Sequence, residues 1–412
     1  MTKLHVQESL MKIELHVSKI IELSNPKLET IVGIFQEIMQ ELLPRLIDGI
    51  VLNFADEMIQ NKDKTVRCER CGSSGTLRWK TRHGEMTKVI TIFQPVLISQ
   101  LQVECVNCNH RYYITRRLLG IAPRKNITDE TKRKLGLIGA LASFRVSEKI
   151  TSLFGWGLDK MMIWRCVQQT AEEIEFDLDP EEEASGEADG TGIPIQGIKK
   201  RGKELKVFVQ NKKNGGIRIA GLSIGDYDKD WGALFRPLIP ALQRFVQPFL
   251  LVTDGDTGAF KALQGKVRVL FQRCLWHIPY QMSYFLWKDG VKRKSDVWYD
   301  CMSQLFDVCS LREHIDDETV IQKLVSLKKR RLNKLIGYCR SSGLTSCASY
   351  LSNARHDLFT SLENKLKGYT TSHVERVMRT VNLRINVGKW SLKGALNSTK
   401  IRLAYYYNGW DA

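Results

Sequence analysis

A carboxylate follows one strongly apolar stretch of the chain. Residues 249–252 (FLLV) have the composition and length of a buried strand, and the chain runs directly on into Thr253, Asp254 and Gly255. A buried strand of an open α/β sheet delivers such a carboxylate, beside a flexible glycine, into the crevice where these sheets bind ligands. The same residues are also typical of an Asp-Gly turn that only closes a strand. The interpretation therefore depends on the residues on either side.

Four other residues complete an ordered set with Asp254. Asp189 precedes it near the start of a strand-rich segment, Cys274 and His277 follow the next apolar stretch (267–271), and Glu375 comes late, on a predicted helix. Carboxylates are the ligands that Mg²⁺ prefers. Two simpler interpretations stand beside this one. Cys274 also fits a buried core thiol, and Ser372-x-x-Glu375 also fits a helix capping box.

A second group of residues that could do chemistry is a double pair of cysteines. Cys68 and Cys71 form one CxxC pair, and Cys105 and Cys108 form another. Four thiolates on two tight turns are the arrangement that a tetrahedral, structural zinc ion needs. The 33 intervening residues exceed the usual zinc-ribbon spacing, but segments 86–93 and 96–103 are rich in strand formers, which predicts an enlarged hairpin. His110 is a spare ligand for this site.

Composition favours a polyanionic partner inside a reducing compartment. The 412 residues carry a formal net charge of +17, and residues 320–412 hold seventeen Lys and Arg against four Asp and Glu. Ten cysteines in a chain of this length do not make a disulfide scaffold. Because no signal peptide or membrane-spanning apolar run is recognisable, we expect a soluble, cytoplasmic protein with no membrane partner.

The elements that must position these residues fall into an amino-terminal half and a carboxyl-terminal half. Residues 1–64 are predicted to be helical, above all 28–60, with a break at Pro44. Residues 65–120 form the predicted zinc ribbon. Its hairpin carries Arg78, Trp79, Lys80, Arg82 and His83, a basic and aromatic mixture suited to DNA. Solvated hairpin tips have a similar composition, so this indication is weak.

Residues 121–176 predict a helix-turn-helix. Three helical segments, 128–142, 147–155 and 158–173, are separated by short turns, and the second ends in glycine. In this arrangement Asp159, Lys160 and Arg165 face DNA. Met162, Ile163 and Val167 then face the core, an arrangement that any three-helix bundle would share.

An acidic stretch, residues 177–187, is predicted to be a solvated linker to an α/β layered domain at 188–412. Strands are predicted at 205–210, 217–224, 249–252 and 267–271, with a helix at 231–246. The segment 280–367 is predicted to be mostly helical.

Asp189, Asp254, Cys274-x-x-His277 and Glu375, in this order, resemble the DDE-class transposases of bacterial insertion sequences. The likeness is to the branch with a C/D-(2)-H motif, which includes Mutator-like elements. The resemblance covers about residues 65–400. It implies an α+β multidomain protein with a helical N-terminus, a zinc ribbon and a helix-turn-helix. These would precede a ribonuclease H-like catalytic domain with a helical insertion.

The resemblance also implies an activity and the residues that carry it. Asp189, Asp254 and Glu375 would hold Mg²⁺ or Mn²⁺ for cleavage at transposon ends and for strand transfer of the 3′-OH into target DNA. Cys274 and His277 would be auxiliary. The partners would be double-stranded DNA of the nucleoid and, on that DNA, further copies of the chain. Lys160, Arg165, Arg78, Lys80, Arg376 and Arg379 would contact DNA.

Two alternatives remain open. A transposase-derived DNA-binding regulator would keep the fold without the activity, although the intact Asp189, Asp254 and Glu375 argue against it. A carboxylate-pair hydrolase such as a glycosidase is the other class. The cysteine pairs and the basic carboxyl-terminal third do not favour it.

Overall fold

The computed structural model describes residues 27–60, 67–82, 84–92, 94–121, 125–198, 203–227, 229–311, 317–366 and 368–412. These residues form a mixed α+β protein with two compact units. The first comprises the described parts of 1–135 and 148–159, and the second comprises 136–147 and those of 160–412. The predicted helix before residue 27, and His83, lie outside the described residues.

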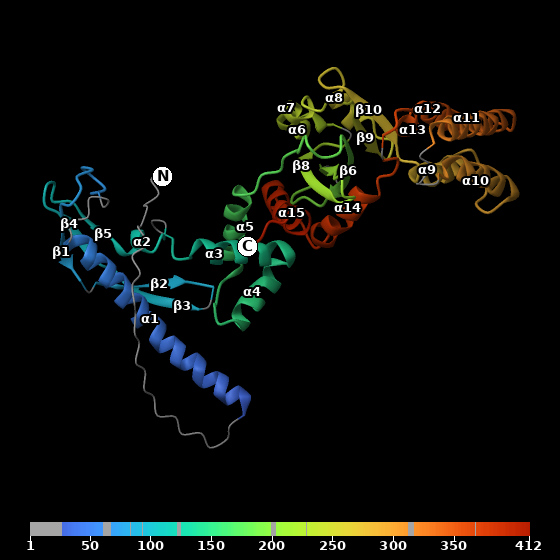
Figure 1. The fold of residues 1–412 in the computed structure, drawn as a ribbon. Coiled ribbons are helices and arrows are strands. Elements are labelled where there is room, and N and C mark those ends of the chain that lie inside the picture. The colour runs from blue at the N-terminus through green and yellow to red at the C-terminus, as the bar shows by residue number, and fades with distance from the viewer. Residues whose placement is uncertain are drawn as a thin grey trace. The chain divides into compact units, whose positions relative to one another are not determined.

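The first unit begins with the long helix α1 (Leu28–Gln60), and the predicted break at Pro44 is wrong (Figure 1). Proline removes one backbone hydrogen bond from a helix. The turns that follow it are held from outside, because Val51 and Ala55 are buried in one cluster with Leu101 and Val103. Tertiary packing therefore compensates for the lost bond.

Two small antiparallel sheets follow. The sheet order is β1-β4-β5 in one, and β2 pairs with β3 in the other, which confirms a hairpin between the cysteine pairs. The helix α2 (Thr115–Leu118) comes after them. The strands are β1 (Leu77–Thr81), β2 (Met86–Ile90), β3 (Pro95–Ser99), β4 (Gln102–Cys105) and β5 (Arg111–Tyr113).

Three helices follow, as predicted: α3 (Asp129–Leu141), α4 (Phe144–Leu153) and α5 (Lys160–Glu172). The second starts at Phe144, three residues before the predicted start at Ser147. The division between the compact units passes through α3 and α4 and leaves α5 in the second unit, whereas the sequence predicted a separate domain at 121–176.

Helix α5 packs on the last helix of the chain, α15 (Leu392–Tyr407). Val167 shares a buried cluster with Ile401 and Ala404, and the Asn397 side-chain amide donates to the Gln168 Oε1 at 2.7 Å. This interface explains why α5 groups with the second unit.

A five-stranded sheet is the centre of the second unit, in the order β10-β9-β6-β7-β8. Strands β6, β7 and β8 are antiparallel neighbours, while β9 runs parallel to β6 and β10 parallel to β9. The strand predicted at 249–252 therefore lies inside the sheet, as expected. The strands are β6 (Ser185–Ile193), β7 (Lys203–Asn211), β8 (Ile217–Gly225), β9 (Phe249–Thr253) and β10 (Val269–Arg273).

The predicted acidic linker at 177–187 is wrong over its last residues. Strand β6 begins at Ser185, and Glu187 is buried within it. Even the preceding residues are anchored, since the Asp179 backbone N–H donates to the Gln210 Oε1 at 2.9 Å. This acidic stretch therefore ends in a strand, and the partner of the buried Glu187 carboxylate is described below.

Helices cover both faces of this sheet. On one face α6 (Trp231–Phe235), α7 (Ile239–Leu242) and α8 (Gly258–Leu263) contribute to one apolar core, and on the other face α14 (Ser372–Ile385) and α15 contribute to a second. The single helix predicted at 231–246 is wrong. It is interrupted by a 3₁₀ turn, η1 (Arg236–Leu238), that contains Pro237.

A helical insertion separates β10 from α14, as predicted. Figure 1 shows the insertion as a group of helices. It has its own apolar core, built from side chains such as Met282, Leu305 and Leu335. Its helices are α9 (His277–Lys288), α10 (Asp296–Cys309), α11 (Glu318–Ser341), α12 (Thr345–Ala354) and α13 (Thr360–Glu363).

Candidate functional site

The carboxylates of Asp189 and Asp254 are positioned by two parallel strands. Glu187 of β6 pairs with Val252 of β9, so Asp189 and Asp254 are each two residues further along neighbouring strands. Asp189 is on the central strand and Asp254 is the first residue after β9. Both residues therefore lie at the level of the carboxyl end of β9, the end at which open α/β sheets bind ligands.

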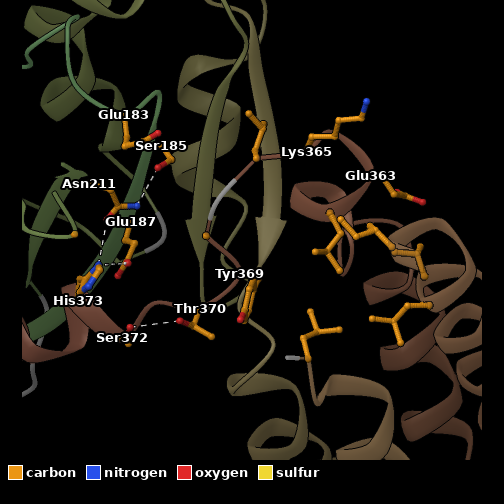
Figure 2. A pocket seen from close by; sticks show the side chains of 18 of the residues that line it. Glu183, Ser185, Glu187, Asn211, Glu363, Lys365, Tyr369, Thr370, Ser372 and His373 are labelled. Atoms are coloured by element: carbon orange, nitrogen blue, oxygen red, sulfur yellow. Dashed lines mark hydrogen bonds and ion pairs between the residues drawn. The ribbon is translucent and has the colours of Figure 1, made fainter. Parts of the chain in front are cut away.

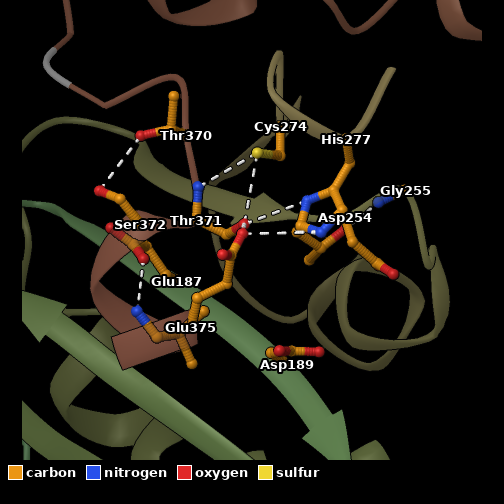
Figure 3. A network of polar contacts seen from close by, with 12 residues as sticks. Glu187, Asp189, Asp254, Gly255, Cys274, His277, Thr370, Thr371, Ser372 and Glu375 are labelled. Atoms are coloured by element: carbon orange, nitrogen blue, oxygen red, sulfur yellow. Dashed lines mark hydrogen bonds and ion pairs between the residues drawn. The ribbon is translucent and has the colours of Figure 1, made fainter. Parts of the chain in front are cut away.

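Glu375 joins them from the far side of the insertion. It lies in the first turn of α14, whose buried face packs on β6 and β7. Figure 3 shows Glu375, Asp189, Asp254, Cys274 and His277 in one view. Residues separated by 186 positions in the sequence thus come to the same site.

The pKa of Asp189 is shifted by burial and by the charged groups near it. Burial raises the pKa of the Asp189 carboxyl to about 7; the backbone N–H of Gly190, which donates to its Oδ1 at 2.7 Å, acts against the rise. The charges of Asp254 and Glu375 raise this pKa further, and His277 lowers it. The three carboxyls and the imidazole therefore share one electrostatic environment.

Thr371 connects the remaining members of the site. Its backbone N–H donates to the Cys274 Sγ at 3.2 Å, and its hydroxyl Oγ1 lies 3.3 Å from both the Cys274 Sγ and the His277 Nδ1. The same oxygen lies 3.2 Å from the Glu375 Oε1 (Figure 3). A hydroxyl can donate one proton and also accept, so Thr371 can donate to Cys274 or Glu375 while it accepts from the His277 Nδ1–H, and it links all three groups.

The predicted capping box at Ser372 and Glu375 is wrong. Thr371, one residue earlier, is the N-cap of α14, and Ser372 is already helical. The cap is supplied from elsewhere, because the buried Glu187 carboxylate accepts from the Val374 backbone N–H at 2.8 Å. Glu375 therefore does not cap the helix.

His277 is held in its charged form. The thiol of Cys274 raises the pKa of His277 to about 8, burial opposes this, and the charges of Asp254 and Glu375 raise it further. Its Nε2 lies 3.6 Å from the Glu375 Oε1. The imidazole can therefore act as a cation beside the carboxylates at neutral pH.

Cys274 is both a core thiol and a member of the polar network. It is fully buried, and its backbone N–H donates to the Thr253 carbonyl at 2.7 Å. Burial acts to raise its pKa, but hydrogen bonds from His277 and Thr371 outweigh burial, so the pKa is lowered. The two interpretations of Cys274 are therefore compatible.

Sequence reasoning missed a second polar cluster beside this site. The Glu187 Oε1 lies 3.0 Å from the His373 Nδ1, which is 3.1 Å from the Asn211 Oδ1. All three residues line a pocket of about 1130 Å³ between the sheet and the insertion (Figure 2). The spacing of Glu187 and Asp189 was a usable signal, because residues two apart in a strand point to the same face.

The four predicted cysteine ligands come together in the first unit. Their sulfurs all lie within 4.8 Å of one another, and among the described residues no other group of three or more Cys, His, Asp or Glu ligand atoms is this close. The Cys68 and Cys108 Sγ atoms are 3.6 Å apart, and those of Cys71 and Cys105 are 3.7 Å apart. Four sulfurs at about 2.3 Å from a tetrahedral zinc ion would be separated by about 3.8 Å. The cluster can therefore hold a metal ion.

The backbone turns that present these cysteines are tight. Gly72 and Asn109 adopt positive φ angles of 68° and 55°, each directly after a CxxC pair. The spare ligand candidate His110 does not belong to the cluster; its ring stacks on Tyr112 with centroids 5.7 Å apart.

The predicted DNA-contacting residues of the ribbon differ in their surroundings. The Arg78 guanidinium forms a salt bridge with Glu104 at 2.8 Å. Trp79 and Arg82 both donate to Asp56 of α1. Lys80 is exposed. Much of the basic and aromatic composition of this hairpin therefore serves internal contacts.

The other predicted contacts lie on helix surfaces. On α5, Lys160 and Arg165 are exposed while Ile163 and Val167 are buried, as expected. On α14, Arg376 and Arg379 are exposed, on the helix that carries Glu375.

Part of the positive charge in the basic carboxyl-terminal segment is structural. Lys328, Arg384 and Arg402 are buried. Lys329 is paired with Glu363. The number of cations that can meet a polyanion is therefore smaller than the sequence count.

Comparisons with protein families and with curated proteins found no relative of this chain. No protein-family model matches the sequence, and no curated protein matches it significantly. Within the described ranges, no helix combines the length and apolar character needed to cross a bilayer.

Proposed function

We propose that the chain is a DDE-type DNA transposase whose second unit is a ribonuclease H-like catalytic domain. The observation that carries this proposal is the site at the sheet edge. It receives Asp189 from β6, Asp254 from the end of β9 and Glu375 from the first turn of α14. A mostly helical insertion between the second Asp and the Glu is the arrangement that the resemblance implies.

The types of side chain at this site suit Mg²⁺ or Mn²⁺. All three carboxylates offer hard oxygen ligands, and Asp189 is raised in pKa by burial and by the charges of the other two. Such mutual repulsion is relieved when a cation is shared. When bound, a pair of these ions would activate the attacking oxygen and stabilise the leaving oxygen of a phosphodiester. Asp189, Asp254 and Glu375 would hold them.

The protein's own residues orient this site. His277, a cation with its Nε2 3.6 Å from the Glu375 Oε1, restrains the carboxylate and lessens its repulsion with Asp254. Cys274 and Thr371 connect the end of β10 to the start of α14, so that the insertion returns Glu375 to the sheet. These three act as positioning residues.

We also propose that the cysteine cluster of the first unit holds structural Zn²⁺. Four thiolates satisfy tetrahedral zinc and leave no open position for substrate, so the ion would stabilise the fold. The exposed cations Lys160, Arg165, Arg376 and Arg379 would contact DNA phosphates. Copies of the chain would assemble on that DNA, within the nucleoid.

The test is cleavage of a plasmid that carries the element and its flanking DNA, with and without Mg²⁺. We expect metal-dependent nicking that Asp189→Asn, Asp254→Asn and Glu375→Gln each abolish while DNA affinity stays near wild type. Asp411→Asn, at an exposed carboxylate, is the matched control. Wild-type protein that binds this DNA but never nicks it would instead identify a DNA-binding regulator.

A further inference from the structure

Helix α9 begins at the catalytic site and presents three different faces. Ile278, Met282 and Leu286 are buried in the core of the insertion. His277 and Gln281 point to the site, and the Gln281 side-chain amide donates to the Asp254 carbonyl oxygen at 3.2 Å. The third face is directed to neither the core nor the site, and it carries exposed aromatic side chains.

Four aromatic side chains occupy this third face, and all are exposed. The exposed fractions are 70% for Trp276, 78% for Tyr280, 57% for Tyr284 and 70% for Trp287. At about 100° per residue these positions fall within roughly 80° of the helix circumference. We call this set the aromatic stripe. Trp is seldom so accessible in a folded protein, and such a group of exposed aromatics marks an interaction surface.

The stripe continues from the catalytic site. Trp276 directly precedes His277, and the stripe lies next to the site-facing residues around the helix. It extends over about 16 Å of helix, the length of several nucleotides at about 3.4 Å each. A strand of DNA that passes the carboxylates can therefore run along it.

Charge at the far end of the stripe indicates the partner. Lys288, Lys292, Arg293 and Lys294 are exposed just beyond Trp287. The intervening acid, Asp289, turns inward and accepts from the Ser346 and Cys347 backbone N–H groups at 3.0 and 2.9 Å. Aromatic faces next to cations are the combination that binds single-stranded nucleic acid: bases stack on the rings and phosphates meet the cations.

We propose that the aromatic stripe of α9 stacks unpaired DNA bases beside the catalytic carboxylates. The substrate would then be DNA that is single-stranded or opened near the cleaved phosphodiester, since the base faces of an intact duplex are hidden in its own stack. This inference rests on the proposed function for the identity of the polymer. The stripe itself can be tested without any catalytic step.

The experiment measures binding of a fluorescein-labelled oligothymidylate and of a blunt duplex by anisotropy, without divalent cations. We expect Trp276→Ala, Tyr280→Ala and Trp287→Ala each to weaken oligothymidylate binding roughly 5- to 150-fold, the loss of one stacked base, with duplex affinity unchanged. Trp287→Phe should retain most of the affinity because the ring is kept. Phe306→Ala, at an exposed aromatic on α10, is the matched control.

Two results would overturn the proposal. One is unchanged oligothymidylate affinity in the alanine variants. The other is unchanged affinity with a lower oligomeric state in size-exclusion chromatography, which would assign the stripe to contact between copies. Crosslinking of wild-type protein to 5-iodouracil-substituted oligonucleotide is independent of variant folding, and adducts confined to residues outside α9 would also refute stacking there. Nicking by the wild type is scored separately, so failure of the stripe and failure of the proposed catalysis are distinguishable.

Discussion

Replacing Asp189 by Asn removes a carboxyl that the folded protein holds in an unfavourable environment. Burial and the neighbouring carboxylates raise its pKa to about 7 from the ordinary value of 3.8. An amide keeps the acceptor for the Gly190 backbone N–H, which donates to Asp189 at 2.7 Å. The variant should therefore lose metal binding and gain stability at the same time, as expected where a site is built for function.

The sign and size of the gain follow from proton linkage. Below about pH 4 the carboxyl is protonated in both states, and it costs no stability. Between about pH 4 and pH 7 only the unfolded state ionises, so the wild type loses stability as the pH rises; above about pH 7 the cost levels off at about 4 kcal/mol. At pH 5 it amounts to about 1.5 kcal/mol. The gain from Asp189→Asn should thus be about 2.5 kcal/mol larger at pH 8 than at pH 5.

Urea unfolding of both proteins at these two pH values, without added divalent cation, measures this difference. Comparing two pH values cancels any effect of the substitution that does not depend on protonation. Asp411→Asn, at an exposed carboxylate, should show no such pH dependence. A gain for Asp189→Asn that is equal at both pH values, or larger at pH 5, would refute the burial argument. Added Mg²⁺ should stabilise the wild type more than the variant.

Three further predictions concern the rest of the chain. Metal analysis should find about one zinc per chain, and Cys68→Ser should lose it and destabilise the first unit in proteolysis. Arg384→Ala should lower the free energy of unfolding by about 2–4 kcal/mol in urea, because the guanidinium lies 4.4 Å from the Trp390 ring centroid and donates to a buried carbonyl; a loss below about 0.5 kcal/mol would contradict this. DNA affinity should fall with salt, and Arg376→Ala should reduce the slope of log affinity against log salt by about 0.9, whereas Lys329→Ala, already paired with Glu363, should leave it unchanged.

The sequence by itself determined most of the elements and the cluster of four cysteines. Strands at 205–210, 217–224 and 249–252, the three helices after residue 128 and the helical insertion were readable because their apolar residues repeat with the period of each element. The four cysteines were readable because CxxC turns bring thiols together locally. Patterns in the sequence therefore predicted those features that depend on interactions between residues close together in the chain.

Errors arose where a distant part of the chain overrides a local preference. Pro44 does not end α1, because packing against the ribbon stabilises the turns after it. The acidic stretch before Asp189 is partly strand, because the Glu187 carboxylate accepts a hydrogen bond from a backbone N–H at the amino-terminal end of α14. That same contact explains why Ser372 and Glu375 form no capping box. None of these partners is near in sequence.

Only the tertiary structure decided how the site is assembled. The sequence ordered Asp189, Asp254 and Glu375, but their convergence needs the parallel pairing of β6 with β9 and the return of the chain through the insertion. The link through Thr371, the charged state of His277 and the raised pKa of Asp189 depend on burial and distance. Strand pairing and burial join residues far apart in the chain, and one-dimensional spacing does not encode those contacts directly.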